Sequence, residues 1–221
     1  MALSPDAIIF WQRGPITINA TIVYTWIVML LLVGSSWLAT RRLSHESHGS
    51  LWQTGLESVV TLIGDQIREI TRQPADHILP FVGTLFLFIA TANVLGVVPG
   101  LRSPTGSLST TAALAVCVFV AVPVYGFMKR GVRGYFGQYV QPSVFMLPFN
   151  ILGELSRTLA LAVRLFGNVM SSEMIVAILL AIVPLFFPVV MQMMGLLIGL
   201  IQAYIFAVLA TVYIASATSD I

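Results

Sequence analysis

Four long stretches without a charged side chain constrain this sequence more than any other feature. Residues 14–40, 78–101, 103–128 and 174–219 contain no Asp, Glu, Lys or Arg. Each is long enough to cross the ~30 Å hydrocarbon layer of a bilayer, which takes about 20 helical residues. Only 9% of the whole chain is charged, against about 25% in a soluble domain. Because lipid cannot satisfy open backbone groups, the sequence predicts an all-α membrane protein.

The first quarter of the chain predicts one span followed by a surface helix. The span covers about residues 16–39, and two basic residues, Arg41 and Arg42, follow it. The positive-inside rule places this end in the cytoplasm and the N-terminus outside. Residues 51–72 then repeat apolar side chains at helical spacing on one face only. This pattern is typical of an amphipathic helix on the membrane surface, here the cytoplasmic one.

The remaining spans form a hairpin and a pair of long helices. The hairpin spans cover about residues 79–98 and 108–128, and the long helices cover about 144–183 and 187–218. At 1.5 Å per residue, a helix of about 40 residues is about 60 Å long, twice the hydrocarbon thickness, so the last two helices should be strongly tilted. We expect about five membrane-embedded helices, one surface helix and a cytoplasmic C-terminus.

These elements should form a single membrane domain, residues 1–221. Within it we expect an outer N-terminus with the first span, the surface helix, the transmembrane hairpin, and the long helix pair that carries the ion path. These parts correspond to residues 1–42, 43–77, 78–133 and 134–221.

Arg164 is the most informative charged residue at membrane depth. A charged side chain at a helix centre costs about 2.5–3.5 kcal/mol on insertion scales, so such residues usually mark an ion path. No acidic residue lies three or four positions from Arg164, so its partner should come from another helix or subunit. The alternative is a structural Arg held by backbone carbonyls. Asn168 and Ser171 lie one and two turns beyond Arg164 and make the same face polar.

Two carboxylates flank Arg164 along the same helix. Glu154 precedes it by ten residues and Glu173 follows it by nine, about 15 Å to either side. The pattern indicates two half-paths separated by a cationic barrier, with Glu154 on the cytoplasmic approach and Glu173 on the outer one. For Glu154, an ordinary pair with Arg157 at i+3 is an equal alternative.

Two motifs give the sequence a specific resemblance to a known family. Arg164-Leu-Phe-Gly-Asn168, followed by Glu173, looks like the RLFGN signature of subunit a of F-type ATP synthases. Gln202 and Tyr213 lie in a segment similar to the second motif of that family, and Asn93 lies in one that resembles the end of its second span. The topology also matches, and two motifs at the right separation are a specific signal.

The resemblance implies a non-catalytic membrane subunit of a rotary motor in the bacterial plasma (inner) membrane. A ring of subunit c helices would turn past this chain, with subunit b of the peripheral stalk and other ATP synthase subunits as further partners. Arg164 would meet a ring carboxylate and favour its ionised form. The transported ion would be H⁺ or Na⁺, because the ring site largely sets selectivity. The ion path would include Arg164, Glu173, Asn168, Gln202, Asn93, Glu154, Tyr213 and Ser171.

Three positions depart from the family pattern on the outer side. Gly195 stands where some relatives carry His or an acid, and Ser107 and Ser109 stand where Asp and Asn are common. Gly195 also forms a small-xxx-small pair with Gly199. This pair indicates either close helix packing or the lining of a water-filled space.

Other classes of protein fit the sequence less well. A secondary ion-coupled transporter is the main alternative, but it would want an internal repeat, and the two halves of this chain differ. A net charge of +2 without a basic block argues against nucleic acid as a partner. The lone Cys117 and the absence of clustered His and Cys spacing predict neither a disulfide nor a metal site. No phosphate-binding Gly-rich loop occurs, so no nucleotide or other cofactor is expected.

Overall fold

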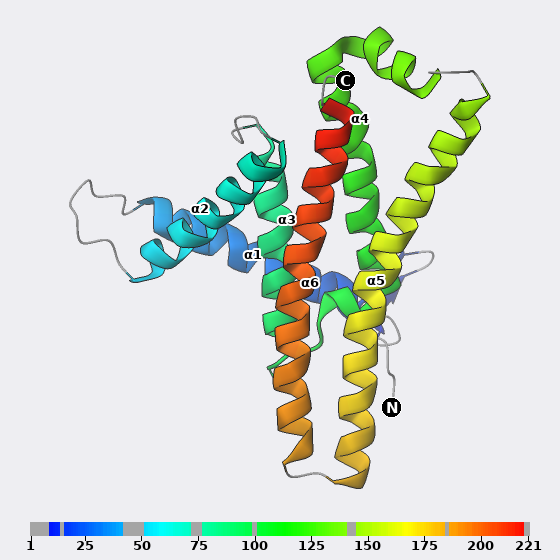
Figure 1. Ribbon diagram of the computed structural model, residues 1–221. Coiled ribbons are helices and arrows are strands. Elements are labelled where there is room, and N and C mark those ends of the chain that lie inside the picture. The colour runs from blue at the N-terminus through cyan, green and yellow to red at the C-terminus, as the bar shows by residue number, and fades with distance from the viewer. Residues whose placement is uncertain are drawn as a thin grey trace.

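The computed structural model describes residues 9–13, 16–41, 51–71, 77–98, 101–140, 145–183 and 186–218. The described part of the chain is almost entirely helical, as predicted (Figure 1). Its helices are α1 (Ala20–Arg41), α2 (Leu51–Thr71), α3 (Leu79–Leu95), α4 (Leu108–Val140), α5 (Met146–Ile182) and α6 (Phe187–Thr218). Its other elements are the short strands β1 (Ile9–Arg13) and β2 (Ile16–Asn19) and a 3₁₀ turn, η2 (Pro104–Gly106).

Apolar helices of membrane-spanning length dominate this architecture. Within the described ranges, α1, α4, α5 and α6 are long and apolar enough to cross a membrane. The fifth apolar helix, α3, has 17 residues, about 25 Å at 1.5 Å per residue, which is at the short end of what spans ~30 Å of hydrocarbon. In Figure 1, α3, α4, α5 and α6 run roughly side by side, whereas α1 crosses behind them. The prediction of an all-α membrane protein is confirmed.

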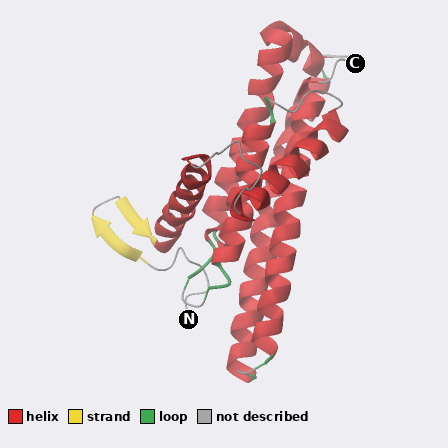
Figure 2. Ribbon diagram, turned by 90° about the vertical axis from the view of Figure 1, so that its left-hand side faces the viewer, coloured by secondary structure: helices red, strands yellow, loops and turns green. Residues whose placement is uncertain are grey.

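The first helix begins later than the sequence predicted. We expected a helix from residue 16, but residues 16–19 form β2, which pairs with β1 in antiparallel register through Trp11 with Ile18 and Arg13 with Ile16. Residues 16–18 are all β-branched, and such side chains fit a strand better than a helix. The hairpin stands beside the helical bundle, next to α1 (Figure 2).

The predicted hairpin is also present, with different ends. Helix α3 ends at Leu95 rather than at Val98, because Gly96 is a poor helix former and a proline at position 99 disfavours helical backbone before it. Helix α4 runs to Val140, but its backbone leaves the helical conformation at Gly131, whose φ is 71°, so two helices meet there at a kink. The first of them ends close to the predicted end at 128, and the apolar span covers Leu108–Lys129.

Helix α2 packs against the bundle through one turn of its apolar face. Ile63 and Ile67 are buried there, at 4% and 1% exposure, and α2 contacts both α3 and α6. On the opposite side, Asp65 and Arg68 form an exposed ion pair at 3.4 Å. The predicted amphipathic helix is therefore confirmed, and part of its apolar face contacts protein. A position on the membrane surface stays a prediction.

Helix α6 lies at the centre of the core and contacts α2, α3, α4 and α5. Its buried face is rich in small side chains, which let neighbouring helices approach closely. Its buried residues include the small Gly199, Ala203, Ala207, Ala210 and Ala217 and the larger Phe206 and Ile214. In contrast, α5 leaves most of its apolar surface exposed; its buried side chains include Leu161, Ala162, Leu165 and Val169. A long apolar helix that is exposed in this way is available to lipid or to another subunit.

Candidate functional site

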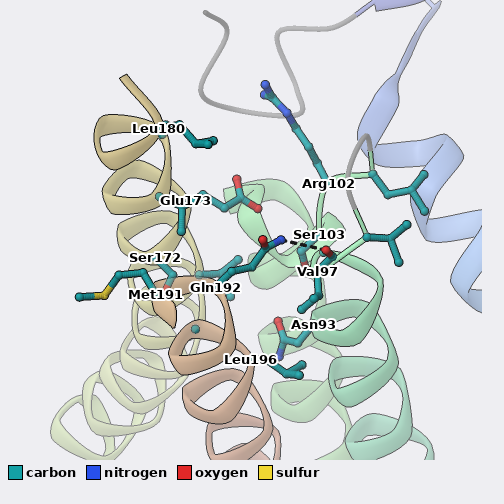
Figure 3. Close-up of a pocket in the computed structure, with 17 residues that line it drawn as sticks. Asn93, Val97, Arg102, Ser103, Ser172, Glu173, Leu180, Met191, Gln192 and Leu196 are labelled. Carbon is teal, nitrogen blue, oxygen red and sulfur yellow. Dashed lines mark hydrogen bonds between the residues drawn. The ribbon is translucent and has the colours of Figure 1, made fainter. Parts of the chain in front are cut away.

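A cavity of about 470 Å³ lies between α3, α5, α6 and the segment that follows α3. Figure 3 shows its polar side chains converging from different elements. Glu173 comes from α5 and points across the cavity toward the segment that holds Ser103. Gln192 of α6 closes one side by donating a hydrogen bond from Nε2 to the carbonyl oxygen of Val97, at 2.8 Å. Three helices thus enclose one cavity with a mainly apolar wall and a few polar side chains, which we call the outer cavity because Glu173 is predicted to lie toward the outer face.

Glu173 is half-buried and touches the segment before α4. A Cβ atom added to Gly106 would lie 3.1 Å from its Oε1 atom, so the carboxylate already rests on the Gly106 backbone. The backbone N–H of Ser103 hydrogen-bonds to the carboxylate, and Arg102 attracts it electrostatically. Burial disfavours a charged carboxylate, whereas hydrogen bonds and a nearby cation favour it. The Glu173 carboxylate is therefore surrounded by the Gly106 backbone, the Ser103 backbone and Arg102 at the wall of the outer cavity.

Asn93 lies beside this environment and is 7% exposed. Its Nδ2 donates to the carbonyl oxygen of Gly199 at 2.9 Å, and its Oδ1 accepts from Thr105 Oγ1 at 3.1 Å. Ser103 and Thr105 join their hydroxyls at 2.6 Å. The amide of Asn93 therefore links α3, α6 and η2 into one network.

Ser107, Ser109 and Gly195, which depart from the family pattern, each contact neighbouring side chains or line the outer cavity. Ser107 and Ser109 pair their hydroxyls at 2.6 Å. Gly195 lines the outer cavity, and a Cβ added to it would lie 3.2 Å from Ser172 Oγ. Gly199 packs directly on Asn93, with 2.9 Å between an added Cβ and Asn93 Cγ. Gly195 thus both lines the outer cavity and lies close to Ser172, whereas Gly199 allows close packing of α6 against α3.

Arg164 lies on an exposed face in the middle of α5. Within the described parts of the chain it forms no ion pair or hydrogen bond. Glu173 follows nine residues later, about two and a half helical turns at 3.6 residues per turn, so the two side chains leave α5 on opposite sides. Ser171 is exposed on the same side as Arg164. The cation and the outer carboxylate thus serve different surfaces of one helix.

Asn168 and Gln202 connect α5 to α6 close to Arg164. Asn168 Nδ2 donates to Gln202 Oε1 at 2.9 Å. Gln202 is 3% exposed, and its buried Nε2 has no partner among the described residues. This amide pair lies between the levels of Glu154 and Glu173 along α5, so it fixes the distance between α5 and α6 where the two approaches would meet.

A second, much smaller cavity lies toward the other end of α5. It measures about 20 Å³, which is close to the minimum volume that holds one water molecule. Glu154, Arg157, Thr158, Tyr213 and Ser216 contribute to its wall. The Arg157 guanidinium carbon lies 5.7 Å from the centre of the Tyr213 ring, within the ~6 Å range of a cation–π contact. We call this space the inner cavity.

The structure therefore groups the predicted site residues into separate places. Asn93 and Glu173 share the outer cavity, and Glu154 and Tyr213 share the inner one. Asn168 and Gln202 lie between, whereas Arg164 and Ser171 join neither cavity. The cavities also bring in residues that the sequence analysis did not assign to the ion path: Arg102, Ser103 and Gln192 at the outer cavity and Arg157 at the inner one. The two arginines and Gln192 carried a signal as charged or polar side chains near apolar stretches, whereas Gly106, which contacts Glu173, carried none.

Comparison with known proteins agrees with these motifs. The family described as ATP synthase A chain matches residues 22–215. The chain is 62% identical to ATP synthase subunit a 2 of Acaryochloris marina over 218 residues, which is 99% of this chain and 93% of that protein. It is 60% identical to ATP synthase subunit a of Albidiferax ferrireducens over 218 residues, 99% of this chain and 94% of the relative. The match thus extends over both cavities and over Arg164 between them, and the chain belongs to the ATP synthase A chain family.

Proposed function

We propose that this chain is the ion-translocating stator subunit of a rotary ATP synthase. Two aqueous half-channels would lead H⁺ or Na⁺ to and from the carboxylates of a rotating subunit c ring, with Arg164 separating them. Membership of the family and the membrane-spanning helices support a place in the membrane part of an ATP synthase. The half-channels, the ring contact and the role of Arg164 are the new part of the proposal.

One observation carries the proposal: two cavities, each with a carboxylate of α5 in its wall, lie on either side of Arg164 along α5 and do not include it. The outer cavity reaches α5 at Val169 and beyond, and the inner cavity reaches it at Glu154, Arg157 and Thr158. A single continuous channel would leak ions across the membrane. Two separate paths that ended at these cavities would need a carrier that moves ions between them.

The exposed face around Arg164 suits such a carrier. Ala160 and Ser171 are exposed on the same side, and Gly167 has open space where a side chain would be. Small side chains let another helix come close. A ring carboxylate that passes here would meet the guanidinium, and an opposite charge within about 4–6 Å favours the ionised carboxylate. The carboxylate would release its ion beside Arg164 and bind another one after leaving it.

The two carboxylates of α5 have distinct parts in this scheme. Glu173 would exchange ions with the wide outer cavity, and Glu154 would serve the narrow inner one together with Tyr213. Asn168 and Gln202 would keep α5 and α6 together between the paths. Arg164 suits the barrier because guanidinium, with a pKa above about 12, stays charged when it loses water.

The proposal also specifies the orientation of the chain in the membrane and its partner subunits. The N-terminus would lie outside and the C-terminus in the cytoplasm of a bacterial inner membrane, since basic residues predominate on the cytoplasmic side. The exposed face of α5 would contact the subunit c ring. Subunit b and the other stator subunits would hold the chain still while the ring turns. The ring site would decide between H⁺ and Na⁺.

Replacement of Arg164 by Ala tests the proposal in the reconstituted complex. ATP-driven ion pumping should be abolished, and passive leak should rise, because ion passage within 4 Å of a unit charge costs about 4 kcal/mol at an effective dielectric constant of about 20. Arg164→Lys should also be severely impaired, because Lys lacks the planar guanidinium and can deprotonate when it is desolvated.

Arg68→Ala is the matched control, since Arg68 is an exposed cation in an ion pair on α2. It should pump normally. Near-normal coupled pumping by a fully assembled Arg164→Ala complex would refute the proposed role. Ion-coupled transport of a solute by this chain alone in liposomes would favour a secondary transporter instead.

A further inference from the structure

We propose that residues 103–106 form a seat that fixes the Glu173 carboxylate, and that Asn93 is the positioning residue that holds this seat in place. The inference deepens the proposed function, because it rests on Glu173 serving the outer path. It assigns Gly106 the task of leaving room for the carboxylate, and it gives Asn93 a role in positioning rather than in carrying ions.

The contact between Gly106 and Glu173 is the first observation. Gly106 is buried, and a Cβ added to it would lie 3.1 Å from Oε1, 3.4 Å from Oε2 and 3.5 Å from the carboxyl carbon of Glu173. No other residue supplies the nearest atoms around that Cβ. The backbone of Gly106 is not in the left-handed region, so an alanine is compatible with its conformation. The room at Gly106 is therefore reserved for this one carboxylate.

The second observation is that the seat cannot move freely. Ser103 and Thr105 are 3% and 0% exposed, and their hydroxyls are 2.6 Å apart. Thr105 is tied to Asn93 Oδ1, and Asn93 Nδ2 is tied to the Gly199 carbonyl oxygen on α6. Buried polar networks of this kind are rigid when their members are satisfied. The seat is thus anchored to two helices that do not carry Glu173.

The third observation concerns Asn93 itself. Both ends of its amide are used, it is 7% exposed, and Gly199 packs against its side chain. An amide that is held at both ends in this way keeps a fixed position between α6 and the seat. It acts on Glu173 through Thr105 and the seat, so that the carboxylate keeps one orientation toward the outer cavity, where Gln192 and Ser172 also lie (Figure 3).

Gly106→Ala probes the seat with a single methyl group whose three nearest atoms would all belong to Glu173. We expect ATP-driven pumping by the assembled complex to fall about tenfold, the size of a typical coupling between contacting residues. Gly83→Ala is the control, because nothing lies within 4 Å of a Cβ added at Gly83, and it should pump normally. Glu173→Asp shortens the side chain by one methylene, so the double variant Gly106→Ala/Glu173→Asp should pump no more slowly than Glu173→Asp alone.

Each other outcome overturns the proposal. Gly106→Ala that pumps like Gly83→Ala shows that no seat is needed, and losses that multiply in the double variant show that the effect does not pass through Glu173. If Gly106→Ala fails to assemble, the double variant should restore assembly, and its failure to do so also counts against the seat. The proposed function is tested separately by Glu173→Gln. If this variant pumps like the wild type, Glu173 does not belong to the ion path.

Discussion

Gly199 on α6 provides the sharpest test of the packing around the site. A Cβ added there would lie 2.9 Å from Asn93 Cγ and 3.0 Å from Asn93 Cβ and Nδ2. Because carbon atoms prefer about 3.5–4.0 Å, Gly199→Ala creates an overlap of roughly 0.5–1 Å with a buried side chain. Asn93 cannot turn aside cheaply, since it is hydrogen-bonded to Thr105 and to Gly199 itself.

The net cost follows from three contributions. Overpacking costs about 1–3 kcal/mol, and loss of an interhelical hydrogen bond in a membrane protein costs about 0.6 kcal/mol. Alanine has a better helix propensity than glycine, which offsets up to about 1 kcal/mol of this cost. We therefore expect Gly199→Ala to destabilise the fold by about 1–3 kcal/mol, or by roughly 2–4 °C in Tm for each kcal/mol if soluble chains of this size are a guide.

Two other glycines make the comparison quantitative. A Cβ at Gly195 would lie 3.2 Å from Ser172 Oγ and 3.3 Å from Ser172 Cβ. The hydroxyl can rotate away but the Cβ cannot, and both distances exceed those at Gly199, so Gly195→Ala should cost less than Gly199→Ala. Gly83 has open space, so Gly83→Ala should be neutral or stabilising. The assay is the temperature at which the solubilised complex loses this subunit on a native gel. Gly199→Ala that is as stable as Gly83→Ala would refute the reasoning. Asn93→Ala removes Cγ and Nδ2 but keeps Cβ, so it should relieve part of the Gly199→Ala defect, and no relief at all would also refute it.

Two further measurements test the surface helix and the outer carboxylate. The first uses a Cys117→Ser background, which removes the exposed native thiol. Cysteines replacing Ile63 and Ile67 should resist a water-soluble thiol reagent because both positions are buried, whereas one replacing Arg68 should react from the cytoplasmic side. Equal labelling at all three positions would contradict the placement of α2. Glu173→Gln should slow ion translocation in membrane vesicles without preventing assembly, because it removes the ionisable group from the outer cavity and keeps its size, and unchanged pumping would exclude that role.

The helices of this protein follow from local sequence. Uninterrupted apolar stretches and the breaks between them predicted α6 at Phe187–Thr218 to the residue and α5 to within two residues at its N-terminal end. Membrane helices are readable in this way because each must satisfy its own backbone within one segment. An error arose where local rules compete, because the β-branched residues of β2 lie at the start of an apolar stretch but favour a strand.

The sequence by itself also determined the order and spacing of the charged groups along α5, because Glu154, Arg164 and Glu173 belong to one helix with a fixed rise per residue. Only the tertiary structure decided what those groups meet. Glu173 rests on Gly106, which is 67 positions earlier in the chain (173 − 106), and Arg157 lies over Tyr213 on α6. Such contacts depend on how α3, α4 and α6 pack around α5, and that packing sums many weak contacts that are distant in sequence.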